Sequence, residues 1–100
     1  MSLDEVTNAF VSRAPEFAGV KARVKFDLGA DGLVLIDATE TPPAVSNEDG
    51  EADCTIRVSL EDLQGMMRGQ VNPTLAYTLG KLKVEGSMGL AMKLAALLDE

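Results

Sequence analysis

Apolar and polar residues alternate without a break over residues 20–28, which predicts a β-strand with one buried and one solvated face. The apolar face holds Val20, Ala22, Val24, Phe26 and Leu28. Residues 29–32 (Gly-Ala-Asp-Gly) are a turn signal, and the apolar run 33–38 follows as a second strand. The two segments predict a β-hairpin, with the more continuously apolar second strand in a central position of the sheet.

Three later segments predict further strands. Residues 52–58 alternate again, with Ala52, Cys54, Ile56 and Val58 on the inward face. Residues 81–85 alternate as a last strand. The segment 39–51 is rich in proline and acidic residues, which is typical of a loop. A short strand at 44–46 fits there because proline is tolerated at sheet edges.

Four segments show helical spacing of apolar residues together with end signals. The predicted helices cover residues 3–14, 60–69, 73–79 and 88–98. Ser2, Ser59 and Asn72 stand at the N-cap positions of the first three, and Pro15 ends the first. Hairpin-linked strands with grouped helices predict an α+β fold, in which helices cover one face of a mainly antiparallel sheet.

The final helix is unusually apolar for a surface element. Leu90, Leu94, Leu97 and Leu98 cover one side, and Met88 and Met92 cover another. Such a helix contacts the sheet on one side and, on the other, a bound lipid, a second subunit or a membrane in transient contact. The alternative is that alanines dilute the exposed side and nothing binds there.

Methionine and glycine residues add detail to the C-terminal, helix-rich half of the chain. Four of the five methionines lie in it, at positions 66, 67, 88 and 92, and flexible thioether side chains suit ligands of varying shape. An ordinary methionine-rich core is the alternative. Gly89 weakens the first turn of the final helix, and Asp99 and Glu100 oppose its dipole. We therefore hypothesise that this helix opens readily and admits ligand.

Composition and charge exclude several classes of protein. The chain has 100 residues, enough for one domain with one core over residues 1–100. Its net charge of −7 disfavours nucleic acid and permanent residence on an anionic membrane. The absence of histidine removes Ser-His-Asp and Cys-His chemistry and most catalytic zinc sites. We expect no enzyme activity, no cofactor and no metal.

The expected location is the cytoplasm. The single cysteine, Cys54, excludes an intramolecular disulfide and suits a reducing compartment. The acidic start of the chain does not look like a signal peptide, and no apolar run reaches the length needed to cross a bilayer. Cys54 itself is expected to be a small buried apolar residue, because no histidine or metal partner activates it.

One long run and several shorter motifs resemble a known family. The run 80–94 reads Gly-Lys-Leu-Lys-Val-Glu-Gly-Ser-Met-Gly-Leu-Ala-Met-Lys-Leu, and it follows the segment 52–59, a helix with Met66, Met67 and Gly69, and Asn72-Pro73. Together these resemble the sterol carrier protein type 2 (SCP-2) domain. The match is close over about 52–94, and the first half matches in its helix-then-hairpin order.

The resemblance implies a five-stranded, mainly antiparallel sheet with one face covered by four to five helices and an apolar tunnel between the layers. It also implies loose binding of fatty acids, fatty acyl-CoA, phospholipids or sterols. The chain departs from the family in three ways. Ser87 replaces a frequent asparagine, the first helix is shorter than in animal members, and the chain ends Leu98-Asp99-Glu100 without a peroxisomal tripeptide.

The expected function is therefore non-catalytic binding and carriage of an apolar ligand. The candidate lining residues are Val24, Phe26, Leu35, Ile56, Met66, Met67, Leu75, Leu79, Leu82, Met88, Met92, Leu94 and Leu98. Plain core packing is the alternative for each of them. Tyr77 could offer its hydroxyl to a polar ligand group.

The rival interpretation is an interaction module whose apolar C-terminal helix mediates homodimerisation, or docks to an enzyme, without carrying a ligand. An enzyme that uses Asp and Glu is a third reading. Nothing in the spacing supports it, because the acidic residues cluster in loops and on outward strand positions.

Overall fold

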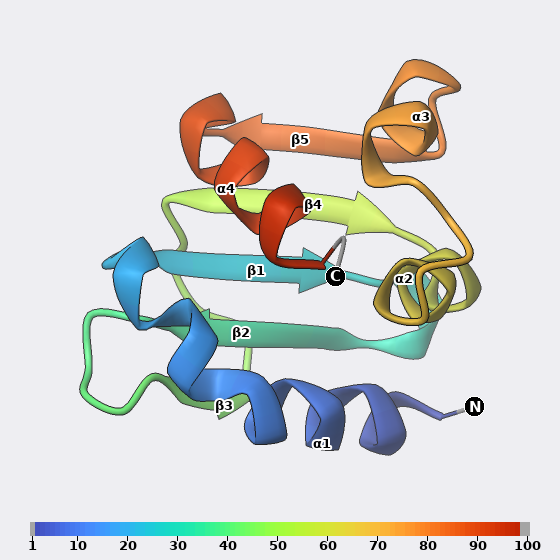
Figure 1. Cartoon of the computed structure of the whole chain (residues 1–100). Coiled ribbons are helices and arrows are strands. Elements are labelled where there is room, and N and C mark those ends of the chain that lie inside the picture. Colours follow the sequence, from blue (N-terminus) through green and yellow to red (C-terminus); the bar gives the residue numbers. More distant parts are fainter. Residues whose placement is uncertain (1, 99–100) are drawn as a thin grey trace.

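Five strands form one mixed sheet in the order β3-β2-β1-β4-β5 (Figure 1). The computed structural model describes residues 2–98. The strands are β1 (Arg23–Asp27), β2 (Leu33–Asp37), β3 (Ala44–Ser46), β4 (Cys54–Val58) and β5 (Leu82–Gly86). The predicted hairpin is confirmed as the antiparallel pair β1–β2, and β2–β3 and β4–β5 are also antiparallel. The β1–β4 pair is parallel, which makes the sheet mainly antiparallel.

The helices lie on one face of this sheet (Figure 1). They are α1 (Leu3–Arg13), the 3₁₀ segment η1 (Ala14–Val20), α2 (Leu60–Met67), α3 (Pro73–Thr78) and α4 (Met88–Leu98), with a short 3₁₀ turn η2 (Gly29–Asp31) in the hairpin. The α+β prediction is therefore confirmed. No helix within residues 2–98 has the length and apolar character required to cross a membrane.

Hydrogen bonds at the helix starts confirm the capping signals. The hydroxyl of Ser2 accepts from the backbone N–H of Glu5 at 3.3 Å, and that of Ser59 accepts from the N–H of Asp62 at 3.0 Å. The side chain of Asn72 accepts in the same way at the start of α3. Each cap satisfies a backbone donor that has no partner inside its helix, so these three sequence positions determine where the helices begin.

Two details of the sequence prediction are corrected. The first strand was expected over 20–28, but η1 continues to Val20 and Lys21 adopts a left-handed φ of 53°, so β1 begins at Arg23. Packing overrides the alternation here, because η1 buries Phe17 and Val20 in the core. The second strand, β2, is flanked on both sides as expected, but β1 is the middle strand. The dipole argument for Asp99 and Glu100 lies outside the described residues.

Three phenylalanines join the two layers. Phe10 of α1 and Phe17 of η1 are fully buried and lie edge to face, with ring centroids 5.8 Å apart. Phe10 also stacks on Phe26 of β1 at 5.0 Å. Such pairs add to the free energy of apolar burial. This cluster therefore holds the first helical segments on the sheet.

Ion pairs occupy the opposite, open face of the sheet. Lys25 pairs with Asp49 at 2.6 Å, and Arg57 lies between Asp27 at 3.8 Å and Glu85 at 3.4 Å. These side chains alternate with the buried ones along β1, β4 and β5. Along β1, β4 and β5 this face is polar, so an apolar site on these three strands has to lie on the helical face.

Asp37, at the end of β2, makes stability depend on pH. The Thr39 hydroxyl donates to its carboxylate and holds the pKa of Asp37 below its usual range, with smaller contributions from the Thr39 N–H and Arg23. Because its native pKa is lowered, the ionised Asp37 carboxylate stabilises the fold at pH values above the ordinary aspartate pKa of about 4. This stabilisation is lost as the pH falls through the native pKa.

Thr39→Val should therefore lower the free energy of unfolding by about 1 kcal/mol at neutral pH. Urea titrations should show that the difference in unfolding free energy between the unaltered chain and Thr39→Val becomes smaller in acid. A difference that does not change with pH would contradict this account.

Gly86 is required at the junction of β5 and α4. Its φ is 93°, and a Cβ there would lie 2.4 Å from the backbone oxygen of Asp53. Gly80 has a similar φ of 77° with open space around it. We expect Gly80→Ala to cost about 1 kcal/mol from the left-handed backbone alone, and Gly86→Ala at least about 2 kcal/mol because the clash adds to it. Thermal unfolding compares the two variants, and equal losses would show that the clash relaxes.

Candidate functional site

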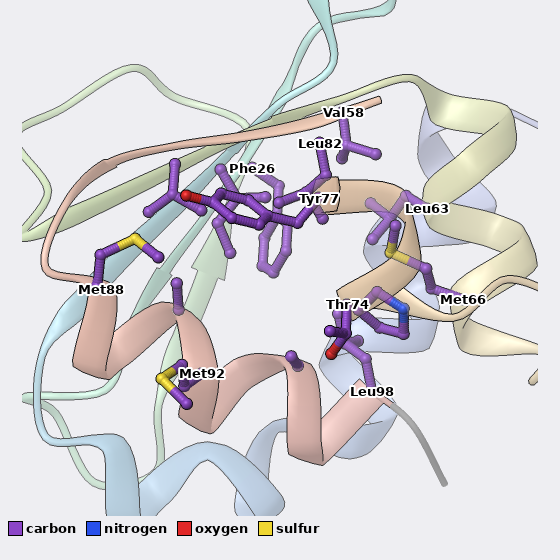
Figure 2. Close-up of a pocket in the computed structure, with 15 residues that line it drawn as sticks. Phe26, Val58, Leu63, Met66, Thr74, Tyr77, Leu82, Met88, Met92 and Leu98 are labelled. Carbon is purple, nitrogen blue, oxygen red and sulfur yellow. The ribbon is translucent and has the colours of Figure 1, made fainter. Parts of the chain in front are cut away.

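An apolar cavity of about 240 Å³ lies between the sheet and the helices α3 and α4 (Figure 2). Strands β1, β4 and β5 form its floor, α2 and α3 one wall, and α4 the other. The lining residues are Phe26, Ile56, Val58, Leu63, Met66, Pro73, Thr74, Tyr77, Leu82, Val84, Met88, Ala91, Met92, Ala95 and Leu98.

The space exists because α4 presents small side chains to the sheet. Met88, Ala91, Met92 and Ala95 share one side of the helix at the spacing i, i+3, i+4 and i+7. The two alanines carry only a methyl group each, so the volume between helix and strands is not filled. A helix with leucine at both positions would close it.

The cavity opens to solvent between α3 and α4. Tyr77 is 48% exposed, Met88 46% and Met92 70%, although all three line the cavity. In Figure 2 the ring of Tyr77 lies across this mouth with its hydroxyl toward Met88. Arg13 anchors the other end of α4 by donating a hydrogen bond to the Leu97 carbonyl oxygen at 2.5 Å. Flexible methionines therefore flank the entrance at one end of α4, and the Arg13–Leu97 hydrogen bond holds the other end of this helix.

The lining is almost without polar groups. None of the described lining residues is charged, and Thr74 and Tyr77 carry its two side-chain hydroxyls. An unpaired charge would be strongly disfavoured inside such a cavity. The site accepts an apolar chain or ring system, and a charged head group has to remain at the mouth.

Reactive groups lie away from this cavity. Cys54 is buried in β4 and does not line it, and burial raises the pKa of its thiol. Within residues 2–98 no group of three or more Cys, Asp or Glu side chains is placed to hold a metal ion. No Cys, Asp or Glu side chain of the described residues therefore lines this cavity.

Seven residues of the predicted set lie in the lining. These are Phe26, Ile56, Met66, Leu82, Met88, Met92 and Leu98. They come from three strands and two helices, and the fold brings them together around one space. Contact between these residues and a ligand stays a prediction.

The other six residues of the predicted set lie outside the lining of this cavity. Val24 and Leu94 are on the helical face but fully packed in the core. Leu35 alternates with the buried Val34 and Ile36, so it lies on the opposite face of the sheet. The remaining three lie on or directly after helices α2 and α3. Met67 faces a separate groove between α1 and α2, and Leu75 and Leu79 are exposed at α3.

The prediction also missed part of the lining, and the sequence carried signals for much of it. Val58 and Val84 continue the inward alternation of Ile56 and Leu82. Ala91 and Ala95 follow from the helical spacing of Met88 and Met92. Leu63 lies one turn before Met66. For Pro73 and Thr74 the signal is absent, because their place depends on how α3 packs beside β5.

Comparison with known proteins places this geometry among related domains. The model of the SCP-2 sterol transfer family matches residues 3–99. Sterol carrier protein 2 of Bos taurus is 53% identical over 67 residues, which is 66% of this chain and 12% of that protein. The chain thus spans about an eighth of the length of the curated relatives that it matches.

Solved structures agree with the family match. Sterol carrier protein 2 from Yarrowia lipolytica in its apo form superposes with a TM-score of 0.72 at 24% identity, covering 87% of this chain and 77% of the other. Sterol carrier protein domain 2 of Helicoverpa armigera gives 0.68 at 29% identity, covering 95% and 80%. The order of elements, the mixed five-stranded sheet and the family match over nearly the whole chain agree: the chain belongs to the SCP-2 sterol transfer family.

Proposed function

We propose that this chain binds and carries apolar ligands in the cavity between its sheet and α3–α4, without catalysing a reaction. The ligand class is a fatty acid, fatty acyl-CoA, phospholipid or sterol. The observation that supports this is a mouth open to solvent that leads into a lining without charged side chains. The cytoplasm is the proposed setting.

The size of the cavity sets the expected affinity. A cavity of about 150 Å³ holds one benzene ring, so the present 240 Å³ holds about ten carbon atoms. At about 0.8 kcal/mol per methylene this gives roughly 8 kcal/mol before the costs of association. A chain of sixteen carbons needs more room. Rotation of Met88 and Met92, which are flexible and exposed, would provide it at the mouth.

The same energetics predict loose selectivity. Each methylene changes the binding free energy by about 0.8 kcal/mol, a factor of about four in affinity, so ligands that differ by one carbon compete within one order of magnitude. The Tyr77 and Thr74 hydroxyls have no hydrogen-bond partner within the described part of the chain. They provide a neutral polar contact near the mouth for a ligand hydroxyl or carbonyl.

A fluorescence titration tests the proposal. cis-Parinaric acid, whose emission rises in an apolar site, should bind saturably to one site per chain, and long-chain alcohols and fatty acids should displace it. Native mass spectrometry should show one ligand per chain. In a series of n-alcohols, affinity should rise with length up to about ten carbons and then more slowly if the cavity stays rigid. Emission that never saturates would show that the cavity is not a binding site.

One observation favours a second candidate function. Among the large apolar side chains of residues 2–98, Met92 is the most exposed, and it lies on α4. This fits an interaction module in which α4 contacts a second copy or an enzyme. Analytical ultracentrifugation separates the two functions, because a ligand-loaded monomer supports carriage. A tight dimer that takes up no cis-parinaric acid supports the module.

A further inference from the structure

The methionines of this chain differ sharply in their access to solvent. Within residues 2–98, Met88 is 46% and Met92 70% exposed, whereas Met66 is 1% exposed. All three line the cavity, and the fourth methionine of this range, Met67, is half-buried beside a separate groove. The thioethers at the entrance can therefore meet a small solute from the solvent, and the thioether in the interior cannot.

A free hydroxyl donor lies opposite one of the exposed thioethers. Tyr77 of α3 and Met88 of α4 both line the mouth, and Figure 2 shows the Tyr77 hydroxyl directed toward the Met88 side chain. Within residues 2–98 no acceptor takes the Tyr77 hydroxyl proton. A thioether sulfur is only a weak acceptor, so the two groups form no strong hydrogen bond. The mouth thus holds an unused donor at a position where a stronger acceptor would bind it.

Oxidation by a peroxide converts the thioether into such an acceptor. A lone pair of the methionine sulfur attacks one oxygen of hydrogen peroxide, and the S–O bond forms as the O–O bond breaks. The departing hydroxide takes the proton of the transferred hydroxyl to give water. Sulfur loses an electron pair and the peroxide gains it. The product, methionine sulfoxide, is polar, and its oxygen accepts hydrogen bonds well.

We propose that Met88 is an oxidation site whose sulfoxide oxygen accepts a hydrogen bond from the Tyr77 hydroxyl, which joins α3 to α4 and closes the cavity mouth. This rests on the proposed function, because a closed mouth slows the exchange of a carried ligand. The oxidant is a peroxide. A methionine sulfoxide reductase, which reduces the sulfoxide with a dithiol, restores the thioether and reopens the mouth.

Burial directs the peroxide to the mouth. A cysteine thiolate is the other sulfur group that peroxides attack, but Cys54 is fully buried and burial raises the pKa of its thiol. Met66 is shielded by its burial in the same way. Met92 is exposed and oxidises as well. The Tyr77 hydroxyl is directed toward Met88, so oxidation of Met88 forms the link across the mouth.

Peptide mass spectrometry after brief exposure to hydrogen peroxide tests the site. Fragment spectra assign the added oxygen to each sulfur. Met88 and Met92 should each gain one oxygen atom at least about tenfold faster than Met66. Equal rates at all three positions would mean that the fold does not direct the reaction, and the proposal would be wrong.

Tyrosine fluorescence tests the hydrogen bond without any ligand, because the chain has one tyrosine and no tryptophan. Emission of Tyr77 should fall when the unaltered chain is oxidised, since a phenol that donates to a strong acceptor emits less. Met88→Leu keeps an apolar side chain that cannot be oxidised in this way, and it should show no fall. Met92→Leu should show the fall in full. A fall that persists in Met88→Leu, or that Met92→Leu removes, overturns the proposal.

Ligand exchange measures the consequence. The experiment uses Met92→Leu, so that Met88 is the oxidised residue at the mouth. After the peroxide is removed, bound cis-parinaric acid is displaced by an excess of n-decanol. Release should be at least about threefold slower after oxidation than before it. Tyr77→Phe in the same background keeps the ring and removes the donor, and it should abolish the difference. Faster release, or a slowing that Tyr77→Phe retains, would show that no hydrogen bond closes the mouth.

The proposed function is scored by the unoxidised chain. If this chain does not bind cis-parinaric acid but Tyr77 emission responds to oxidation of Met88, carriage is wrong and the modification site stands. If it binds the probe saturably and neither emission nor release responds to oxidation, carriage stands and the modification site is wrong.

Discussion

Ala95→Phe is expected to weaken cis-parinaric acid binding at least about thirtyfold, which corresponds to about 2 kcal/mol. Ala95 lines the cavity from α4, and its methyl group leaves the space that a ligand would occupy. A phenyl ring has the volume of a benzene molecule, which fills a cavity of about 150 Å³, so most of the 240 Å³ would be lost. Isothermal titration and the fluorescence assay both measure the change.

Ala96→Phe is the matched control for this prediction. Ala96 is the next residue of α4, it is exposed, and it does not line the cavity. The substitution adds the same ring to the same helix, so any general effect on α4 appears in both variants. Binding should stay within about twofold of the unaltered chain, which corresponds to about 0.4 kcal/mol. Equal binding by the two variants would show that the ligand does not enter the cavity.

The largest expected loss of stability comes from Phe10→Ala, about 3–5 kcal/mol. Phe10 is fully buried. Its ring lies edge to face with Phe17 and stacks on Phe26. The substitution leaves a void between α1 and β1 and removes both aromatic pairs. A domain of this size has about 5–15 kcal/mol in total, so the variant should be close to unfolding at physiological temperature.

Urea denaturation followed by circular dichroism measures this loss. Val11→Ala, one residue along the same helix, should change the free energy of unfolding by less than about 0.5 kcal/mol, because Val11 is exposed. Phe26 lines the ligand cavity and stacks on Phe10. Phe10→Ala should therefore weaken ligand binding as well. A variant with normal stability would show that α1 adds little to the core.

The loss of ligand binding in Ala95→Phe and the loss of stability in Phe10→Ala arise in different parts of the layer between the helices and the sheet. The phenylalanine cluster fills the interface between α1, η1 and β1, whereas the alanines of α4 leave the interface with β4 and β5 unfilled. A chain with four aromatic residues has few large side chains to place, and three of them are used in the cluster. The distribution of large and small residues thus separates a filled half of the interior from a half that contains the cavity.

Most elements could be predicted from the sequence because their signals are local. The alternation at 52–58 and 81–85, which the structure places at 54–58 and 82–86, and the caps at Ser2, Ser59 and Asn72 depend on residues within one turn or one strand. The inward faces of β1 and β4 followed from the same alternation. The exception was 20–22, where η1 and the left-handed Lys21 replace the strand, because tertiary packing of Phe17 outweighs a local pattern.

The cavity could be predicted only in part, because periodicity shows which face a residue is on and not what lies opposite. Val24 and Phe26 share a face of β1, but only Phe26 lies beneath the gap left by Ala91 and Ala95. Leu35 shows the same limit, since an apolar run such as 33–36 does not reveal which alternate residues face the helices.

The sequence by itself determined the α-helices, most of the strand positions and the apolar character of α4, since each follows from neighbouring residues along the chain. Only the tertiary structure decided that Leu75 and Leu79 lie outside the cavity and that Pro73 and Thr74 lie in it. Whether a space is filled or empty depends on side chains from distant segments meeting at one point. That meeting is a property of the packed fold, and no local pattern encodes it.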